Sequence, residues 1–144
     1  MYEPATRAPL NLGETVIESF HAARATYVRD HVILAALGSL GAMGVLLAMG
    51  DPNFWVGTVA AVAAIGVRGA YLASDDLTAR WDLTQTRLLG PQGRAVRLDR
   101  IARLNSLGSA IQIVTQDGDK HLMKYLADKA AVKARIEAAQ RTAR

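Results

Sequence analysis

The sequence predicts an α+β membrane protein, in which a transmembrane α-hairpin precedes a small antiparallel β domain with a C-terminal helix. Two long apolar segments, 32–50 and 54–73, each approach the roughly 20 residues that a helix needs to cross a bilayer. After them, short apolar runs alternate with turn residues, which is typical of antiparallel strands. The chain then ends in an alanine-rich stretch with Lys and Glu, which predicts a helix.

The apolar segments divide the chain into three predicted parts. These are a cytoplasmic N-terminal segment (1–31), the transmembrane hairpin (32–73) and a cytoplasmic domain (74–144). The alternative for the hairpin is a buried core of a soluble protein. We favour the membrane, because two runs of this length with Arg68 as their one charge are rare in so small a chain.

Small residues recur at helical spacing in the first apolar segment. In lipid, such residues let helix backbones approach closely. Two interpretations stay open: the small-residue faces pack against each other within the hairpin, or one of them docks onto another membrane protein. The candidate helix-packing residues are Gly38, Gly41, Ala42, Gly44 and Ala48.

Charge predicts the orientation of the hairpin. From Ser74 onward the chain has 13 Lys or Arg against 8 Asp or Glu, whereas the turn Asp51-Pro52-Asn53 carries only one acid. Basic residues near a span stay in the cytoplasm. We therefore expect a multi-pass protein with both termini cytoplasmic and the turn outside.

Two segments before and after the hairpin are ambiguous. Residues 14–21 have the β-branched and aromatic character of a strand, but their apolar residues also fall on a rough helical stripe. Residues 94–107 combine apolar and basic residues at a spacing of three, which fits a basic amphipathic helix on a membrane. The same residues also fit two strands, 96–98 and 101–104, with a bend at Asp99.

The remaining elements of the polar domain have clearer patterns. Strands are predicted at 79–83, 95–98 and 110–115, and the last of these returns through an Asp117-Gly118 turn into 120–126. A helix is predicted over 128–141, with Asp128 as its N-cap.

Several short motifs together resemble a known family. They are Leu10-x-x-Gly13-Glu14-x-Val16-Ile17, Trp81-x-Leu83-Thr84-x-x-Arg87-Leu88, Gly93, Val96-x-Leu98-x-x-Ile101 and the helix after Leu126-Ala127-Asp128. This arrangement resembles the bacterial PH-like domain family, in its membrane-anchored form with a two-helix transmembrane hairpin.

The resemblance implies a strongly bent antiparallel sheet capped by a C-terminal helix, with the hairpin inserted between its opening segment and its body. It favours strands over a helix for residues 94–107 and implies the bacterial cytoplasmic (inner) membrane. It also implies that Thr84 and Arg87 hold a turn together. The stretch Arg103–Ser109 is shorter than in the family, which leaves the strand register of 94–109 open.

No catalytic, cofactor-binding or metal site is predicted, so we expect a protein that is not an enzyme and has no cofactor. The chain has no cysteine, and His21, His31 and His121 are not spaced as metal ligands. Gly90-Pro91-Gln92-Gly93 lacks the Lys and Ser/Thr of a phosphate-binding loop.

Positive charge is the remaining functional signal. Anionic lipid headgroups attract basic residues near a membrane surface. Nucleic acid is not expected as a partner, because no recognition helix or aromatic–basic pattern is present. The candidate residues for binding lipid or a protein partner are Arg87, Arg94, Arg97, Arg100, Arg103, Lys120 and Lys124.

The sequence thus favours a membrane-anchored binding module, which presents its PH-like domain at the cytoplasmic face. Its partners would be anionic lipids and another integral-membrane protein, whose complex it would bind or help to assemble. The alternative is an accessory structural subunit that contacts a larger membrane complex through its transmembrane helices.

Overall fold

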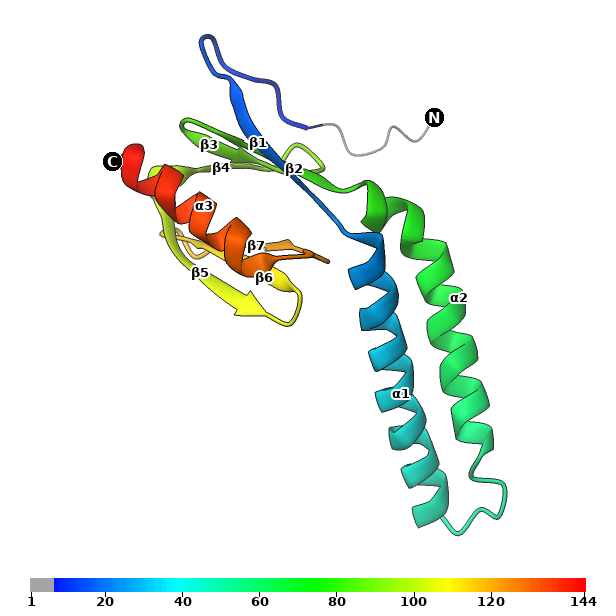
Figure 1. Ribbon diagram of the computed structural model, residues 1–144. Coiled ribbons are helices and arrows are strands. Elements are labelled where there is room, and N and C mark those ends of the chain that lie inside the picture. Colours follow the sequence, from blue (N-terminus) through cyan, green and yellow to red (C-terminus); the bar gives the residue numbers. More distant parts are fainter. Residues whose placement is uncertain (1–6) are drawn as a thin grey trace. The chain divides into compact units, whose positions relative to one another are not determined.

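The computed structural model describes residues 7–144, so residues 1–6 of the predicted N-terminal segment lie outside the described part (Figure 1). The contacts divide the chain into two units. One is a β unit, formed by the residues up to Thr26 together with Asp75–Arg144. The other is a helical hairpin, Tyr27–Ser74, inserted into the sequence of the first. The secondary structure is therefore α+β.

The first sheet of the β unit is a four-stranded antiparallel meander. Its strands are β1 (Val16–His21), β2 (Arg80–Thr84), β3 (Arg87–Leu89) and β4 (Ala95–Arg97), in this spatial order. The ambiguous segment 14–21 is thus a strand. Its partner β2 lies beyond the hairpin in the sequence, which a local pattern cannot reveal.

The second sheet contains three antiparallel strands, β5 (Ile101–Leu107), β6 (Ala110–Thr115) and β7 (Lys120–Met123). A 3₁₀ turn, η1 (Leu98–Arg100), separates it from the first sheet. The polar domain therefore contains two sheets where one bent sheet was expected. The basic helix considered for 94–107 is wrong, because β4, η1 and β5 occupy that segment.

The connection between β6 and β7 is longer than the predicted two-residue turn. The N–H of Thr115 donates to the carbonyl of Asp119 at 2.9 Å, which closes a loop around Gln116, Asp117 and Gly118. Gly118 has φ +90°, a left-handed conformation that is common at the end of three-residue hairpin loops.

Helix α3 (Lys129–Thr142) completes the β unit and packs on it (Figure 1). Its predicted N-cap is confirmed, since the Asp128 side chain accepts a hydrogen bond from the N–H of Ala131 at 3.1 Å. Ile136 of α3 is fully buried in a core that draws on both sheets. The other buried members of this core are Phe20, Trp81, Leu83, Leu88, Val96, Leu98, Ile101, Leu104, Ile111, Ile113, Met123 and Leu126.

The hairpin comes from two long helices, α1 (Arg24–Ala48) and α2 (Val56–Thr78). Both are long and apolar enough to cross a membrane. Helix α1 begins eight residues before the predicted first span, and α2 ends five residues after the predicted second span. Helix α1 ends at Ala48, and Gly50 just beyond it has φ +77°. The N–H of Gly50 bonds the carbonyl of Leu47, and the N–H of Asp51 bonds that of Leu46, a pattern that satisfies the last carbonyls of a helix.

Glycines on α2 mark where the two helices of the hairpin meet. A Cβ on Gly57 would lie 2.8 Å from backbone atoms of Ala42 and Met43. A Cβ on Gly69 would lie 2.8 Å from the ring of His31. Small residues at these positions allow close packing of the helix backbones. Most other side chains of the hairpin, including Leu37, Leu40 and Val67, are exposed.

Candidate functional site

The seven predicted basic residues fall into two groups. Three are held by carboxylates: Arg87 by Glu14, Arg97 by Asp99 at 2.6 Å and Arg100 by Asp117 at 2.7 Å. The other four form no ion pair with the described residues 7–144 and are exposed. These four are Arg94, Arg103, Lys120 and Lys124.

Two of the unpaired basic residues share one face of the second sheet, which we call the outer face. Residues Ile111, Ile113 and Met123 point the other way, into the core. The strand register places Val114 between Arg103 and Lys120, because Val114 pairs with both. The residues that alternate onto this face are Arg103, Asn105, Leu107, Ala110, Gln112, Val114, Lys120 and Leu122.

The outer face combines apolar and positive groups. Leu107 is 49% exposed and Leu122 is 38% exposed, and they flank the sheet on β5 and β7. No carboxylate alternates onto this face from the three described strands. A surface of this kind suits an anionic, partly apolar partner.

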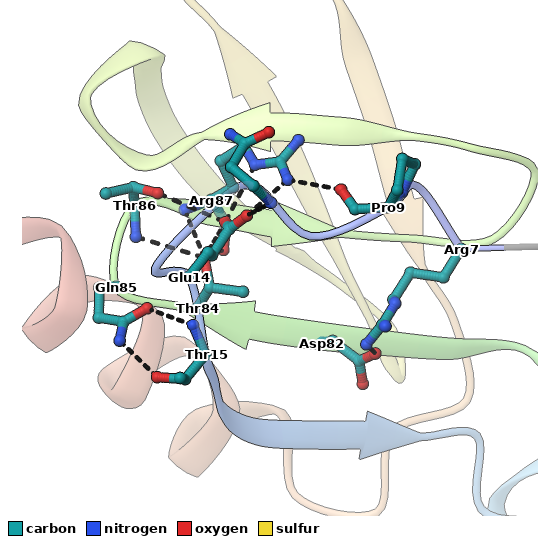
Figure 2. A network of polar contacts seen from close by, with 10 residues as sticks. Arg7, Pro9, Glu14, Thr15, Asp82, Thr84, Gln85, Thr86 and Arg87 are labelled. Carbon is teal, nitrogen blue, oxygen red and sulfur yellow. Dashed lines mark hydrogen bonds and ion pairs between the residues drawn. The ribbon is translucent and has the colours of Figure 1, made fainter.

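Arg87 belongs to a buried polar network instead (Figure 2). Its Nε and Nη2 donate to the two carboxylate oxygens of Glu14 at 3.0 and 2.6 Å. The same Nη2 donates to the carbonyl of Pro9 at 2.9 Å. The side chains of Glu14 and Arg87 are only 4% and 15% exposed. Arg87 therefore holds the segment before β1 against the β2–β3 turn and is not open to a lipid.

Thr84 supports the same network from the β2–β3 turn. Its hydroxyl donates to Oε1 of Glu14 at 2.6 Å and accepts from the N–H of Arg87 at 2.9 Å. Hydrogen bonds from Arg87 lower the pKa of Glu14 from 4.5 to about 2, although burial alone would raise it. The hydrogen bonds to Glu14 raise the pKa of Arg87, so both side chains are ionised throughout the physiological range.

A second buried carboxylate, Asp82 on β2, binds Arg7 and Ser19 of the segment before the hairpin. Its side chain is 1% exposed and accepts hydrogen bonds from Ser19 and Arg7, each at 2.6 Å, and from Arg80 at 3.1 Å. Burial raises the pKa of Asp82, but these hydrogen bonds and the two positive charges outweigh it, so the pKa lies below its usual value. Figure 2 shows Arg7 reaching across to this carboxylate.

The predicted helix-packing residues divide between the inside and the outside of the hairpin. A Cβ on Gly38 would meet Ile65 at 3.2 Å and Ala61 at 3.7 Å, and Ala42 contacts Gly57. Gly41 and Gly44 have nothing within 4 Å of such a Cβ, and Ala48 is exposed. Packing within the hairpin thus uses Gly38 and Ala42, whereas the other three face away from α2.

Sequence reasoning missed the roles of Glu14 and Asp82. Asp82 lies inside the strand-like run Trp81-Asp82-Leu83, and an acid among core residues is a signal of a buried ion pair. Glu14 offered no such signal, because Arg87 is far from it in the sequence.

Comparison of the chain with protein-family models, curated proteins and solved structures found no match.

Proposed function

We propose that this protein is a membrane-anchored, non-enzymatic binding module. The two-helix hairpin spans the bacterial inner membrane, and a PH-like β unit at the cytoplasmic face binds an integral-membrane partner or helps to assemble its complex. The observation that carries this proposal is the position of the hairpin. It connects β1 to β2, which pair directly with each other.

The order of elements supports the PH-like part of the proposal. A four-stranded antiparallel meander is followed by a three-stranded one and by a closing helix, α3. We take this order of two antiparallel sheets and a closing helix as support for a PH-like unit, although the motifs implied one bent sheet. An anchor inserted between two adjacent strands restrains the β unit at both ends of the insertion, so the unit stays close to the membrane surface.

The outer face of the second sheet is the proposed docking surface. Arg103 and Lys120 each contribute about 1 kcal/mol of attraction to an anionic surface. Leu107 and Leu122 add apolar area beside them. Arg97 and Arg100 contribute less, because each already has a carboxylate partner.

The alternative, an accessory subunit that binds through its helices, is favoured by one observation. Gly41, Gly44 and Ala48 face away from α2 and leave a shallow strip on α1. In a membrane, such a strip admits close approach of another helix.

Crosslinking in native membranes distinguishes the two functions. The full chain carries a photoreactive residue at Leu107, and adducts are compared among variants. We expect the adduct to disappear in Arg103→Glu/Lys120→Glu and to persist in Gly41→Leu/Gly44→Leu. Lys133→Glu, on α3, is the matched charge control. Loss in the glycine variant alone favours the accessory subunit, and absence of any adduct in the unmodified chain contradicts the proposal.

A further inference from the structure

A cavity of about 170 Å³ lies in the β unit where β1 ends and β2 begins. All of its lining residues belong to the β unit. Its floor is apolar and comes from the core residues Phe20, Trp81, Met123 and Leu126. This volume is large enough for a small polar group of several non-hydrogen atoms.

The rim of this cavity carries charges of both signs. Asp75 and Asp76 come from the last turns of α2, Arg94 from the β3–β4 turn and Lys124 from the end of β7. No ion pair joins these four side chains to one another or to the rest of residues 7–144. Unpaired charges of opposite sign around an apolar floor suit a ligand that is itself zwitterionic.

Asp75 and Asp76 lie at the C-terminal end of a helix, where acidic residues are unfavourable. The C-terminal end of a helix is electronegative, and acidic residues there are unfavourable, yet α2 has no basic residue in its last turn to offset them. A cation beside Asp75 and Asp76 would be attracted by both carboxylates and by the helix end. The carboxylates accept hydrogen bonds only, so a primary ammonium with its three donors is the suitable partner.

Strained backbone surrounds the same cavity. Two non-glycine residues in the described part of the chain have positive φ: Gln92 at 62° and Tyr125 at 58°. Gln92 lines the cavity, and Tyr125 lies between its lining residues Lys124 and Leu126. Such conformations cost energy and cluster at functional sites. Gln92 lies two residues before Arg94, and Tyr125 directly follows Lys124.

We propose that this cavity binds a zwitterionic group with a primary ammonium and a phosphate. Asp75 and Asp76 receive the ammonium, and Arg94 and Lys124 receive the phosphate. Two sources share this chemistry, the headgroup of phosphatidylethanolamine and free phosphoethanolamine. The headgroup source rests on the proposed function, because the aspartates directly follow the apolar part of α2 and lie at headgroup depth if that helix spans a bilayer.

The fluorescence of Trp81 can report binding of a ligand in the cavity. It lines the cavity, and the chain has two tryptophans, so Trp55→Phe leaves Trp81 as the single one. The full chain in detergent is titrated with phosphoethanolamine and, in parallel, with phosphocholine, and Trp81 fluorescence is recorded. A second arm compares nanodiscs of phosphatidylethanolamine, phosphatidylcholine and phosphatidylglycerol.

We expect a saturable response to phosphoethanolamine and to phosphatidylethanolamine. Binding should weaken about tenfold in Asp75→Asn/Asp76→Asn and in Arg94→Gln/Lys124→Gln, and change less than about twofold in the controls Glu137→Gln and Lys133→Gln, which lie on α3 outside the cavity. Thermal unfolding checks that each variant is folded. If the double aspartate variant is unfolded, Asp76→Asn alone carries the test.

No saturable response, an equal response to phosphocholine, or equal weakening by the control substitutions would overturn the inference. A response to phosphoethanolamine without one to phosphatidylethanolamine supports the site and assigns it a soluble ligand. Membrane insertion is measured separately. If the protein inserts but does not bind phosphoethanolamine or phosphatidylethanolamine, this inference fails while the proposed function still stands.

Discussion

Two buried carboxylates, Glu14 and Asp82, hold the start of the described chain to the strands that follow the hairpin. Glu14 binds Arg87 through two hydrogen bonds, and Asp82 binds Arg7, Ser19 and Arg80. These contacts join both sides of a long insertion, so they offset the entropy lost when β1 and β2 pair across it. Their role is structural, and both pairs lie away from the outer face of the second sheet.

Replacing Glu14 with Gln should lower the free energy of unfolding by about 1–3 kcal/mol, because the guanidinium of Arg87 is left buried without its charged partner. Chemical denaturation of the full chain in detergent measures the loss. Glu18→Gln is the control, since Glu18 pairs with the exposed Arg135 and the loss of a solvent-exposed pair should destabilise the chain much less. Equal effects of the two substitutions would contradict the buried role of Glu14.

The low pKa of Glu14 predicts that the free energy of unfolding falls at acidic pH. Glu14 has a pKa of about 2 in the folded chain against 4.5 ordinarily, so the unfolded state binds more protons between these values. Its stabilisation is complete above about pH 4.5 and is lost as the pH falls toward 2. Solvent screening reduces it to about 1–2 kcal/mol. Unfolding midpoints from pH 6 to 2 should fall less steeply in Glu14→Gln than in the unmodified chain, and parallel curves would refute this.

At the scale of elements, the hairpin depends on a line of close approach between its helices. Gly57, Ala61, Ile65 and Gly69 recur every four residues on α2, and all four lie against Gly38, Ala42 or His31 of α1. Tyr27 adds a buried hydrogen bond of 2.6 Å from its hydroxyl to the carbonyl of Gly69. A Cβ added at Gly41 or Gly44 of α1 would meet nothing within 4 Å, so these two positions are open in the hairpin.

Gly57→Leu should destabilise the hairpin by about 1–3 kcal/mol, because a side chain there collides with the backbone of α1. Gly41→Leu is the matched control and should leave hairpin stability nearly unchanged, since that position is open. Loss of helical circular dichroism during titration with a denaturing detergent measures both. If Gly41→Leu is as damaging as Gly57→Leu, the packing face is misassigned.

At the scale of the whole molecule, an apolar hairpin is inserted into a basic β unit. The proposed function makes the hairpin an anchor and places the β unit with both termini in the cytoplasm. The charge distribution supports this orientation, because Lys and Arg accumulate on the terminal sides of the two helices.

The chain contains no cysteine, so single cysteines can test the orientation directly. In intact cells, Asn53→Cys in the α1–α2 turn should react with a membrane-impermeant thiol reagent. Thr142→Cys at the end of α3 should react only after the cells are opened. Labelling of both positions in intact cells, or of neither, would refute the proposed topology.

Elements with a local signal can be recognised from the amino-acid sequence without the fold. These include the two apolar helices, the Asp128 cap, strand β6 and the positive charge of the C-terminal part. Length and apolar content are properties of one continuous segment and a cap depends on the adjacent turn, so distant contacts do not change them.

Features that depend on residues distant in the sequence become visible only in the three-dimensional fold. Residues 14–21 have no clear period, and the pairing of β1 with β2 across the hairpin makes them a strand. The motif places Arg87 with Thr84 at a turn, but its ion pair with Glu14 depends on a segment before the hairpin that only the fold brings near. Likewise, Asp75 and Asp76 follow an apolar segment as ordinary polar residues. The fold brings them to the rim of a cavity with Arg94 and Lys124, because ends of strands that are remote in sequence meet there.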